Sequence, residues 1–290
     1  MRLIKPSVEI IKQEEYDLNH IFKFIELAGR TCYKSENKIT EDSAKEFVDR
    51  MIKSGHGAML EHGTVYLTIP NKNVSRSLLI YNYEMNPYSI VIWTNDNVYI
   101  TTNYRVIIEN NWNDHLEYIT TPTEFHIRRT TVKFICDRGI SHEFVRHRVF
   151  SFAQESTRYC NYTKDKFNNE LTFIIPCWIK DLEESNYYAY CEYHHSKNDA
   201  SKRWFDSCMS SEFIYTNLIE EGWKPQEARS ILPNSLKTEL IMTGFNSDWQ
   251  HFFELRCAPN AHPQAKELAD MLKDKFNKDL TEGKDKYSIW

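Results

Sequence analysis

The sequence contains few glycines and no glycine-rich nucleotide-binding motif. Only 8 of its 290 residues are glycine, and neither G-x-G-x-x-G nor G-x-x-x-x-G-K occurs. Both motifs let the backbone approach a phosphate closely, so their absence excludes a Rossmann-type turn and a P-loop. If the protein binds a dinucleotide, arginine and histidine side chains must supply the contacts instead.

Further absences narrow the class of protein. The 7 cysteines are scattered and never form a C-x-x-C pair, which favours reduced thiols over a disulfide framework or a structural zinc site. No apolar run approaches the length of a membrane span, and the first residues lack the apolar core of a signal peptide. The net charge of -5 is not the basic excess typical of nucleic-acid-binding proteins. We therefore expect a cytoplasmic protein without a membrane or nucleic-acid partner.

Hydrophobic periodicity predicts one α+β domain over residues 1–290. The hydrophobic fraction of 41% is sufficient for a globular core. The mixed order of helices and strands favours a central antiparallel-type sheet flanked by helices over a doubly wound sheet. The segment at about 70–130 is rich in Asn, Tyr, Thr and Ile, which predicts an inserted β-hairpin region.

The expected elements follow from helical and alternating spacing and from capping residues. Helices are expected at 17–29, from Thr40 as the cap to Gly55, from Ser141 through Arg146 and His147, within 183–221, from Pro225 through Arg229, from Ser247 as the cap to Arg256, and at 263–280. Strands are expected at 64–69, 89–94, 98–108, 131–136 and 238–242, with a turn at 137–139.

The segment from Arg146 to Tyr159 concentrates positive charge and hydroxyl groups. It contains three arginines, one histidine, Ser151, Ser156 and Thr157. Guanidinium groups this close together repel one another unless an anion or an acidic partner lies between them. The planar fork of arginine matches phosphate in a bidentate way. The segment therefore predicts a phosphate-binding site, with a solvated basic helix end as the alternative.

Four motifs resemble those of the flavin-dependent thymidylate synthases. Arg-His-Arg at 146–148, followed by seven residues and Ser156, resembles the signature of that family. His56, Glu61 and His62 match its His-x-x-x-x-Glu-His segment, Arg229 its Ala-Arg-x-x-Leu-Pro segment, and Arg256 its Trp-x-His-Phe-x-x-x-Arg helix. The resemblance covers residues 20–69 and 131–275. Taken by themselves, these residues also admit a metal site at 56–62, surface salt bridges for the two later arginines and a nucleophilic role for Ser156.

The resemblance implies an activity and a set of ligands. The reaction would be the reductive methylation of dUMP to dTMP with 5,10-methylenetetrahydrofolate, FAD and NADPH, carried out by a homotetramer. No metal is implied. Arg256 would be the catalytic residue, because a fixed guanidinium near the uracil ring favours the N3-deprotonated pyrimidine. The implied dUMP contacts are Glu143, Arg146, Gln154, Glu155, Ser156, Thr157, Arg158, Arg229 and Arg256, and the implied FAD contacts are His56, Arg146, His147, Arg148, Gln154 and His251.

The chain departs from the family pattern at several positions. Glu143 and Gln154 stand where the family often has Gln and Glu, and both keep hydrogen-bonding ability. Ala58 replaces a common Thr and Phe245 a flavin-contacting Asn, so these two contacts are not carried over. No function is assigned to the insertion. Two other functions stay open: a non-catalytic nucleotide sensor that binds dUMP without FAD, and an RNA-binding module that uses the arginines and tyrosines.

Overall fold

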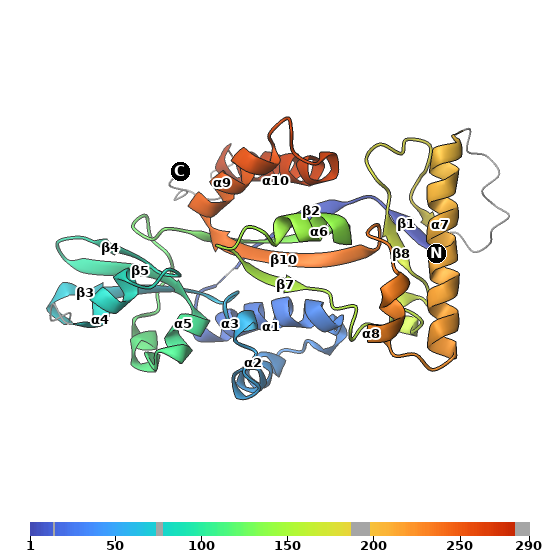
Figure 1. Cartoon of the computed structure of the whole chain (residues 1–290). Helices are drawn as coiled ribbons and strands as arrows, with labels where there is room; N and C mark the ends of the chain where they lie inside the picture. The colour runs from blue at the N-terminus through green and yellow to red at the C-terminus, as the bar shows by residue number, and fades with distance from the viewer. Residues whose placement is uncertain (14, 74–77, 187–197, 282–290) are drawn as a thin grey trace.

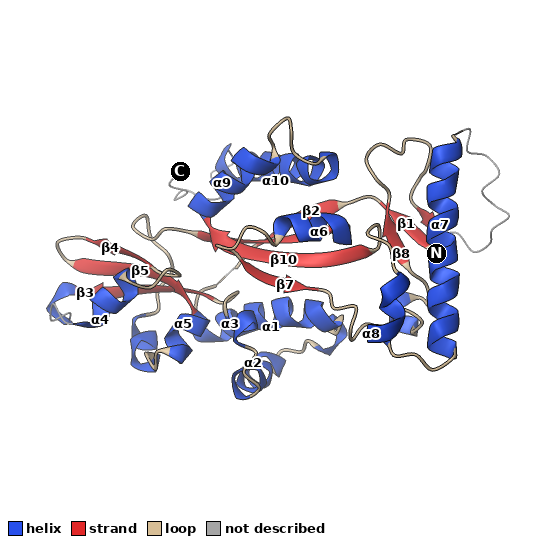
Figure 2. Ribbon diagram, viewed as in Figure 1, coloured by secondary structure: helices blue, strands red, loops and turns tan. Residues whose placement is uncertain are grey.

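The largest of the three sheets in the described part of the chain is antiparallel throughout. The computed structural model describes residues 1–13, 15–73, 78–186 and 198–281 (Figure 1, Figure 2). The large sheet has the strand order β2-β6-β10-β7, and β10 pairs with β6 over its whole length. The expected α+β fold with a central antiparallel sheet is confirmed. The four strands are β2 (Ser7–Ile11), β6 (Arg129–Asp137), β7 (Ser151–Gln154) and β10 (Lys237–Phe245).

Period-two alternation gives the large sheet two different faces. The even-numbered residues of β6 and β10, such as Phe134, Leu240 and Met242, pack against Phe144 and Trp249 of the overlying helices. We call this side the α6 face. It is covered by α6 (Arg138–Phe144), α9 (Asn246–Arg256) and α10 (Pro263–Thr281), which lie above β10 in Figure 1.

The opposite side, which we call the α1 face, is covered by α1 (Leu18–Tyr33). Ile241 packs there with Ala28 and Ala153 in a small apolar cluster. Because residues of one strand alternate, Lys237, Glu239 and Thr243 project to this face as well. Helices α2 (Ser43–Lys53) and α3 (Gly57–Leu60) continue this layer below the sheet (Figure 1).

A second sheet has the order β3-β5-β4 and a core of its own with α1 and α2. The hairpin predicted within residues 70–130 is present as β4 and β5. The prediction of a strand up to residue 108 is wrong, because the Asn103 side chain accepts a hydrogen bond from Val106 N at 3.1 Å and starts a helix. The elements are β3 (Thr64–Pro70), α4 (Leu78–Glu84), β4 (Ile90–Trp93), β5 (Asn97–Asn103) and α5 (Tyr104–Glu109), with 3-10 turns at Asn71–Asn73 and Asn113–Tyr118.

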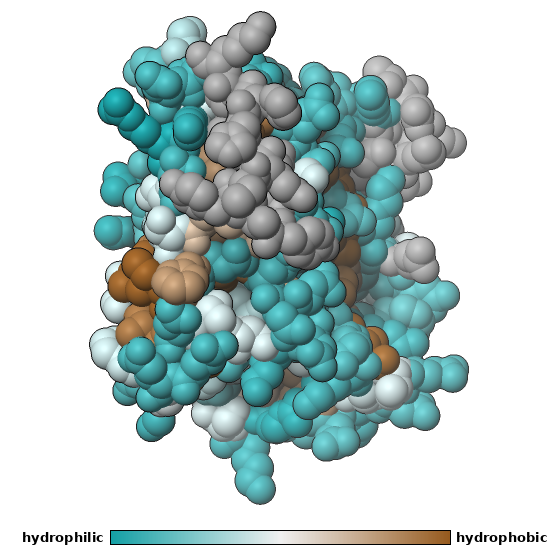
Figure 3. Space-filling model, turned by 90° about the vertical axis from the view of Figure 1, so that its right-hand side faces the viewer, coloured by the Kyte–Doolittle hydropathy of each residue, from teal (hydrophilic) through white to brown (hydrophobic). Residues whose placement is uncertain are grey.

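The third sheet has the order β8-β1-β9, and β1 and β8 are parallel. The long helix α7 lies beside it, and the surface seen from that side is mostly hydrophilic, with hydrophobic residues in small patches (Figure 3). Of the helix predicted within 183–221, α7 accounts for 199–220, 185–186 is a strand, and 187–197 lie outside the described residues. The elements are β1 (Arg2–Ile4), β8 (Thr172–Ile174), β9 (Ser185–Asn186), α7 (Asp199–Glu220), α8 (Pro225–Ala228) and 3-10 turns at Glu36–Lys38, Asp165–Phe167 and Arg229–Ile231.

Three predicted helix starts are wrong. Asp42, not Thr40, precedes α2, and Phe245, not Ser247, precedes α9. Asp137 caps α6 by accepting a hydrogen bond from Ile140 N at 2.8 Å, so the turn expected at 137–139 is the start of that helix. The start of α6 follows from Asp137, because a short acidic side chain at this position accepts a hydrogen bond from the free N–H groups of the first helical turn.

The signature arginines do not lie on a helix as predicted. Helix α6 ends at Phe144, so residues 146–148 form the turn between α6 and β7. The helices expected around 17–29, 225–229 and 263–280 are confirmed, with shifts of a few residues at their ends. Among the described helices, none combines the length and apolar character needed to cross a membrane.

Candidate functional site

Arg256, the last residue of α9, is held against the end of α6 by three hydrogen bonds. Its Nη1 lies 2.9 Å from Glu143 Oε2, and its Nη2 donates to the Glu143 carbonyl at 2.6 Å. Its Nε donates to His147 Nε2 at 2.9 Å. These contacts fix the plane of the guanidinium, because three different donors are engaged. We call this group the Arg256 triangle.

His147 enters the triangle as a neutral base. Burial and the charge of Arg256 lower its pKa to about 4, so near pH 7 its Nε2 carries a lone pair that can accept from Arg256. Its ring also packs on Phe252 with centroids 5.1 Å apart. Two residues predicted from distant motifs, His147 and Arg256, are thus brought together by the packing of α6 and α9.

The neighbours of His147 face outward. Arg146 and Arg148 are exposed, and within the described part of the chain neither makes a hydrogen bond or ion pair. Exposed guanidiniums on both sides of a buried histidine suit contacts with anionic groups at the surface of the chain. His251 is also exposed, with its Nδ1 3.4 Å from Glu254 Oε2.

Gln154 and Glu155 point to opposite faces of the large sheet. Gln154 Nε2 donates to Ser141 Oγ of α6 at 2.8 Å. Glu155 lies on the α1 face, where Tyr162 donates its hydroxyl hydrogen to Oε1 at 2.9 Å and Lys237 Nζ lies 2.8 Å from Oε2. Alternation along β7 accounts for the opposite directions of these adjacent side chains.

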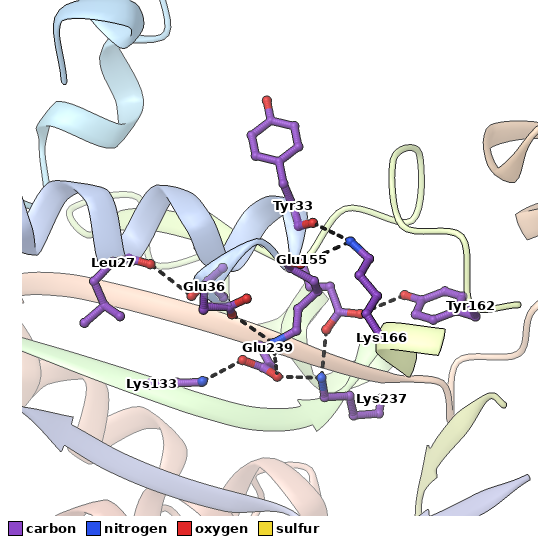
Figure 4. Close-up of polar contacts among 11 residues, drawn as sticks. Leu27, Tyr33, Glu36, Lys133, Glu155, Tyr162, Lys166, Lys237 and Glu239 are labelled. Atoms are coloured by element: carbon purple, nitrogen blue, oxygen red, sulfur yellow. Dashed lines mark hydrogen bonds and ion pairs between the residues drawn. The ribbon is translucent and has the colours of Figure 1, made fainter. Parts of the chain in front are cut away.

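Glu155 belongs to a buried charge network that sequence reasoning missed (Figure 4). Glu239 is its centre: Oε1 lies 2.8 Å from Lys34 Nζ and 2.7 Å from Lys237 Nζ, and Oε2 lies 2.6 Å from Lys133 Nζ. Lys34 also contacts Glu36 at 2.9 Å. The only local sign was the Lys-Thr-Glu alternation at 237–239, because the other members lie in β6 and in the segments that directly follow α1 and β7.

The opposite charges in this network favour each other's ionised forms. Burial alone would raise the pKa of Glu239, but the positive charges of Lys237, Lys34 and Lys133 outweigh burial and hold this pKa well below its ordinary value. Burial would likewise lower the pKa of Lys237, but the two carboxylates beside it raise that pKa. Glu239 and Lys237 therefore stay ionised at neutral pH.

The loop after β7 carries the residues expected to bind phosphate. Ser156 Oγ accepts a hydrogen bond from Arg158 N at 3.3 Å. Thr157 Oγ1 accepts one from Arg229 Nη1 at 3.1 Å, which joins two of the predicted site residues. Both arginines are exposed. The guanidinium of Arg229 therefore lies against this loop, next to the hydroxyls of Ser156 and Thr157, whereas that of Arg158 lies over the Tyr159 ring at 5.3 Å. A guanidinium beside hydroxyl groups is a set of donors that can bind phosphate.

The residues of the His-x-x-x-x-Glu-His segment point to different partners. His56 is exposed at the start of α3, and Glu61 Oε1 lies 2.6 Å from Arg105 Nη1. His62 is buried, with its Nδ1 2.8 Å from Thr243 Oγ1. Burial and the nearby charge of Arg129 lower the pKa of His62 to about 3. Only His56 of the three can reach a ligand at the surface.

A cavity of about 400 Å³ adjoins the start of α6. Glu143 is the only predicted site residue that lines it, so Glu143 borders both the cavity and the Arg256 triangle. The other lining residues include the aliphatic Ile140, Pro176 and Pro233, and the aromatic or polar Asp137, Trp178, Trp204, Asn234, His262 and Gln264.

Comparison with known proteins places this arrangement in a family. The family described as "Thymidylate synthase complementing protein" matches residues 95–280. A flavin-dependent thymidylate synthase from Pyrococcus furiosus is 30% identical over 207 residues, which cover 68% of this chain and 78% of that protein. Proteins of the same name from Geobacter sulfurreducens and Corynebacterium aurimucosum are 30% and 21% identical, over 46% and 84% of this chain and 49% and 71% of theirs.

A solved structure of a UMP/dUMP methylase, PolB from Streptomyces cacaoi bound with 5-Br dUMP, aligns with 96% of this chain and 93% of that one. Its TM-score is 0.44 and its sequence identity 17%.

Proposed function

The chain belongs to the thymidylate synthase complementing protein family, and on that premise we propose that it is a flavin-dependent thymidylate synthase. It converts dUMP to dTMP with FAD as cofactor, 5,10-methylenetetrahydrofolate as the carbon donor and NADPH as the reductant. The observation that carries the proposal is the Arg256 triangle, because it places a rigid guanidinium beside exposed arginines at a family motif.

Arg256 is the catalytic residue of the proposal. The bound flavin would supply the redox chemistry and the passage of the one-carbon unit. A guanidinium held by Glu143 and neutral His147 can stabilise negative charge on the uracil ring after loss of the N3 proton. Loss of that proton makes C5 a stronger carbon nucleophile.

The exposed cationic groups fit anionic ligands. Arg146 and Arg148 have the free donors that the pyrophosphate of FAD needs. The other proposed FAD contacts are His56, His147, Gln154 and His251. The proposed dUMP contacts are Glu143, Arg146, Gln154, Ser156, Thr157, Arg158, Arg229 and Arg256. Glu155 is buried beneath them and contributes through Lys237 and Tyr162.

The proposed dUMP contacts lie in two groups. The Arg256 triangle is on the α6 face, whereas Arg229 follows α8, which lies below the sheet in Figure 1. A homotetramer, in which one subunit completes the site of another, would unite the two groups. We propose this assembly, in the cytoplasm, for the present chain.

The test is the anaerobic absorbance of the flavin. Purified protein with FAD and NADPH is compared with and without dUMP. Flavin bleaching that is faster with dUMP, followed by dTMP formation when methylenetetrahydrofolate is added, supports the synthase. Binding of dUMP without any binding of FAD supports the alternative, a nucleotide sensor, and contradicts the synthase.

A further inference from the structure

Glu155 directly precedes the residues proposed to bind the phosphate of dUMP. A free carboxylate at that position would repel a phosphate. Its side chain is only 1% exposed, and both of its oxygens are engaged by Lys237 and Tyr162. The carboxylate is therefore directed away from any ligand that the loop binds and into the buried charge network.

Every positive charge in the network is paired with a carboxylate of the same network. Its positive members are Lys34, Lys133 and Lys237, and its negative members are Glu36, Glu155 and Glu239. Each lysine is paired with at least one of these carboxylates. A direct anion-binding role for the cluster is therefore disfavoured, since every positive charge is already compensated.

The backbone at Glu155 and Ser156 is also held by hydrogen bonds to other elements. Glu155 N donates to Glu239 O at 2.9 Å, and Ser156 N donates to Cys32 O at 2.9 Å. From the far end of the loop, Lys166 Nζ donates to the carbonyl oxygens of Tyr33 and Lys34 at 3.2 and 3.1 Å (Figure 4). Residues 155–164 form turns without helix or strand. The placement of this loop therefore depends on its anchors.

We propose that Glu155 is a positioning residue: its pairing with Lys237, and through Lys237 with Glu239, holds Ser156, Thr157 and Arg158 in the arrangement that binds the phosphate of dUMP. This inference rests on the proposed function. A buried ion pair adds little stability relative to a well-packed apolar pair. Its benefit here is geometric, because a displaced donor loses its charge-assisted hydrogen bond to the phosphate.

The test uses Glu155→Gln and Lys237→Met, singly and together, in the full-length protein. Gln keeps an acceptor for Tyr162, and Met keeps most of the lysine stem, so each change removes mainly charge. Either change should raise KM and the calorimetric Kd for dUMP by roughly 10- to 100-fold, the loss expected for one hydrogen bond to a charged phosphate. The value of kcat at saturating dUMP, and FAD affinity, should stay within about twofold. The Kd of the double variant should rise by less than the product of the two single-variant rises, because Glu155 and Lys237 are in direct contact.

A matched control is the exposed pair Lys45 and Asp49 on α2, whose side chains are 75% and 58% exposed. The variants Lys45→Met and Asp49→Gln should leave dUMP binding unchanged. Trypsin should cleave after exposed Arg158 faster in Glu155→Gln than in the control. If the ion-pair variants do not fold, Tyr162→Phe carries the test, with an expected rise in Kd of roughly three- to tenfold from the loss of one hydrogen bond to a carboxylate.

Three results would overturn the positioning role. If Lys237→Met left dUMP affinity intact while Glu155→Gln weakened it, Glu155 would be a direct ligand. Equal losses of kcat, FAD binding and folded fraction would mean a purely structural role. An unchanged Kd for dUMP in every folded variant would show that the Glu155–Lys237 pair does not affect dUMP binding. A wild-type protein that binds dUMP but forms no dTMP contradicts the synthase activity instead, and leaves the calorimetric comparison intact.

Discussion

The two faces of the large sheet are stabilised in different ways. The α6 face is an apolar core of aromatic and aliphatic side chains, and the Arg256 triangle lies at its edge. The α1 face has only a small apolar cluster around Ile241, flanked by the charge network near Glu239 and by the hydroxyl of Thr243 with His62. The difference shows how one strand, β10, can stabilise the fold on one side and position a loop on the other.

The largest expected effect tests the apolar side of this comparison. Trp249 is fully buried on the α6 face, and its Nε1 donates to Thr130 O at 3.1 Å. Trp249→Ala should lower the free energy of unfolding by about 3–5 kcal/mol, as measured by urea denaturation. Ile241→Ala, on the α1 face, should cost less because its apolar cluster is small. Leu255→Ala, half exposed on α9, is the control, and equal losses in all three would contradict the comparison.

A second change targets the edge of the α6 face. Arg256→Lys removes the planar fork that contacts Glu143 and His147 together. The rate of dTMP formation should fall by about 10²–10³-fold, roughly the effect of losing one preorganised donor. The unfolding midpoint and flavin content should match those of Arg203→Lys on the exposed side of α7. Undiminished dTMP formation would rule out the role given to Arg256.

Acid titrates two buried histidines, His147 beside the α6 face and His62 on the α1 face, before it titrates Glu239. The folded pKa values of His147 and His62 are about 4 and about 3, below the ordinary 6.5. The unfolded chain therefore binds protons first, and stability should fall as pH drops from 6.5. Glu239 has a folded pKa below the ordinary 4.5, so its contribution is present above pH 4.5 and is lost at lower pH. Glu239→Gln should abolish only this later loss in pH-dependent urea denaturation, and an unaltered pH profile would contradict the assignment.

The smallest expected effect on folding is at the exposed turn. Arg148→Ala should change the free energy of unfolding by no more than about 0.5 kcal/mol, because Arg148 is exposed and makes no ion pair within the described chain. FAD binding should weaken by roughly tenfold, the loss of a charge-assisted hydrogen bond. Fluorescence titration of FAD, with Arg203→Ala as the control, measures this. A loss of stability without any change in FAD affinity would mean that Arg148 stabilises the fold and does not bind FAD.

Local patterns predicted the parts of the fold that depend on one buried face. The apolar stripe of α1 and the alternation of β3, β6 and β10 are properties of consecutive residues. Helix α5 was missed because the capping contact of Asn103 ends a strand that the composition would continue. The signature turn at 146–148 was taken for helix because charge and spacing do not show where α6 stops.

The candidate site divides in the same way. The sequence by itself determined which residue types are available, including the arginines of the signature and the motifs around Arg229 and Arg256. Only the tertiary structure decided that Arg256 meets Glu143 and His147, and that Glu155 turns inward to Lys237. The physical reason is that the charge of a buried group must be compensated in three dimensions. The compensating groups lie in β6 and β10 and in the segments that follow α1 and β7, and no local pattern encodes the proximity of these segments.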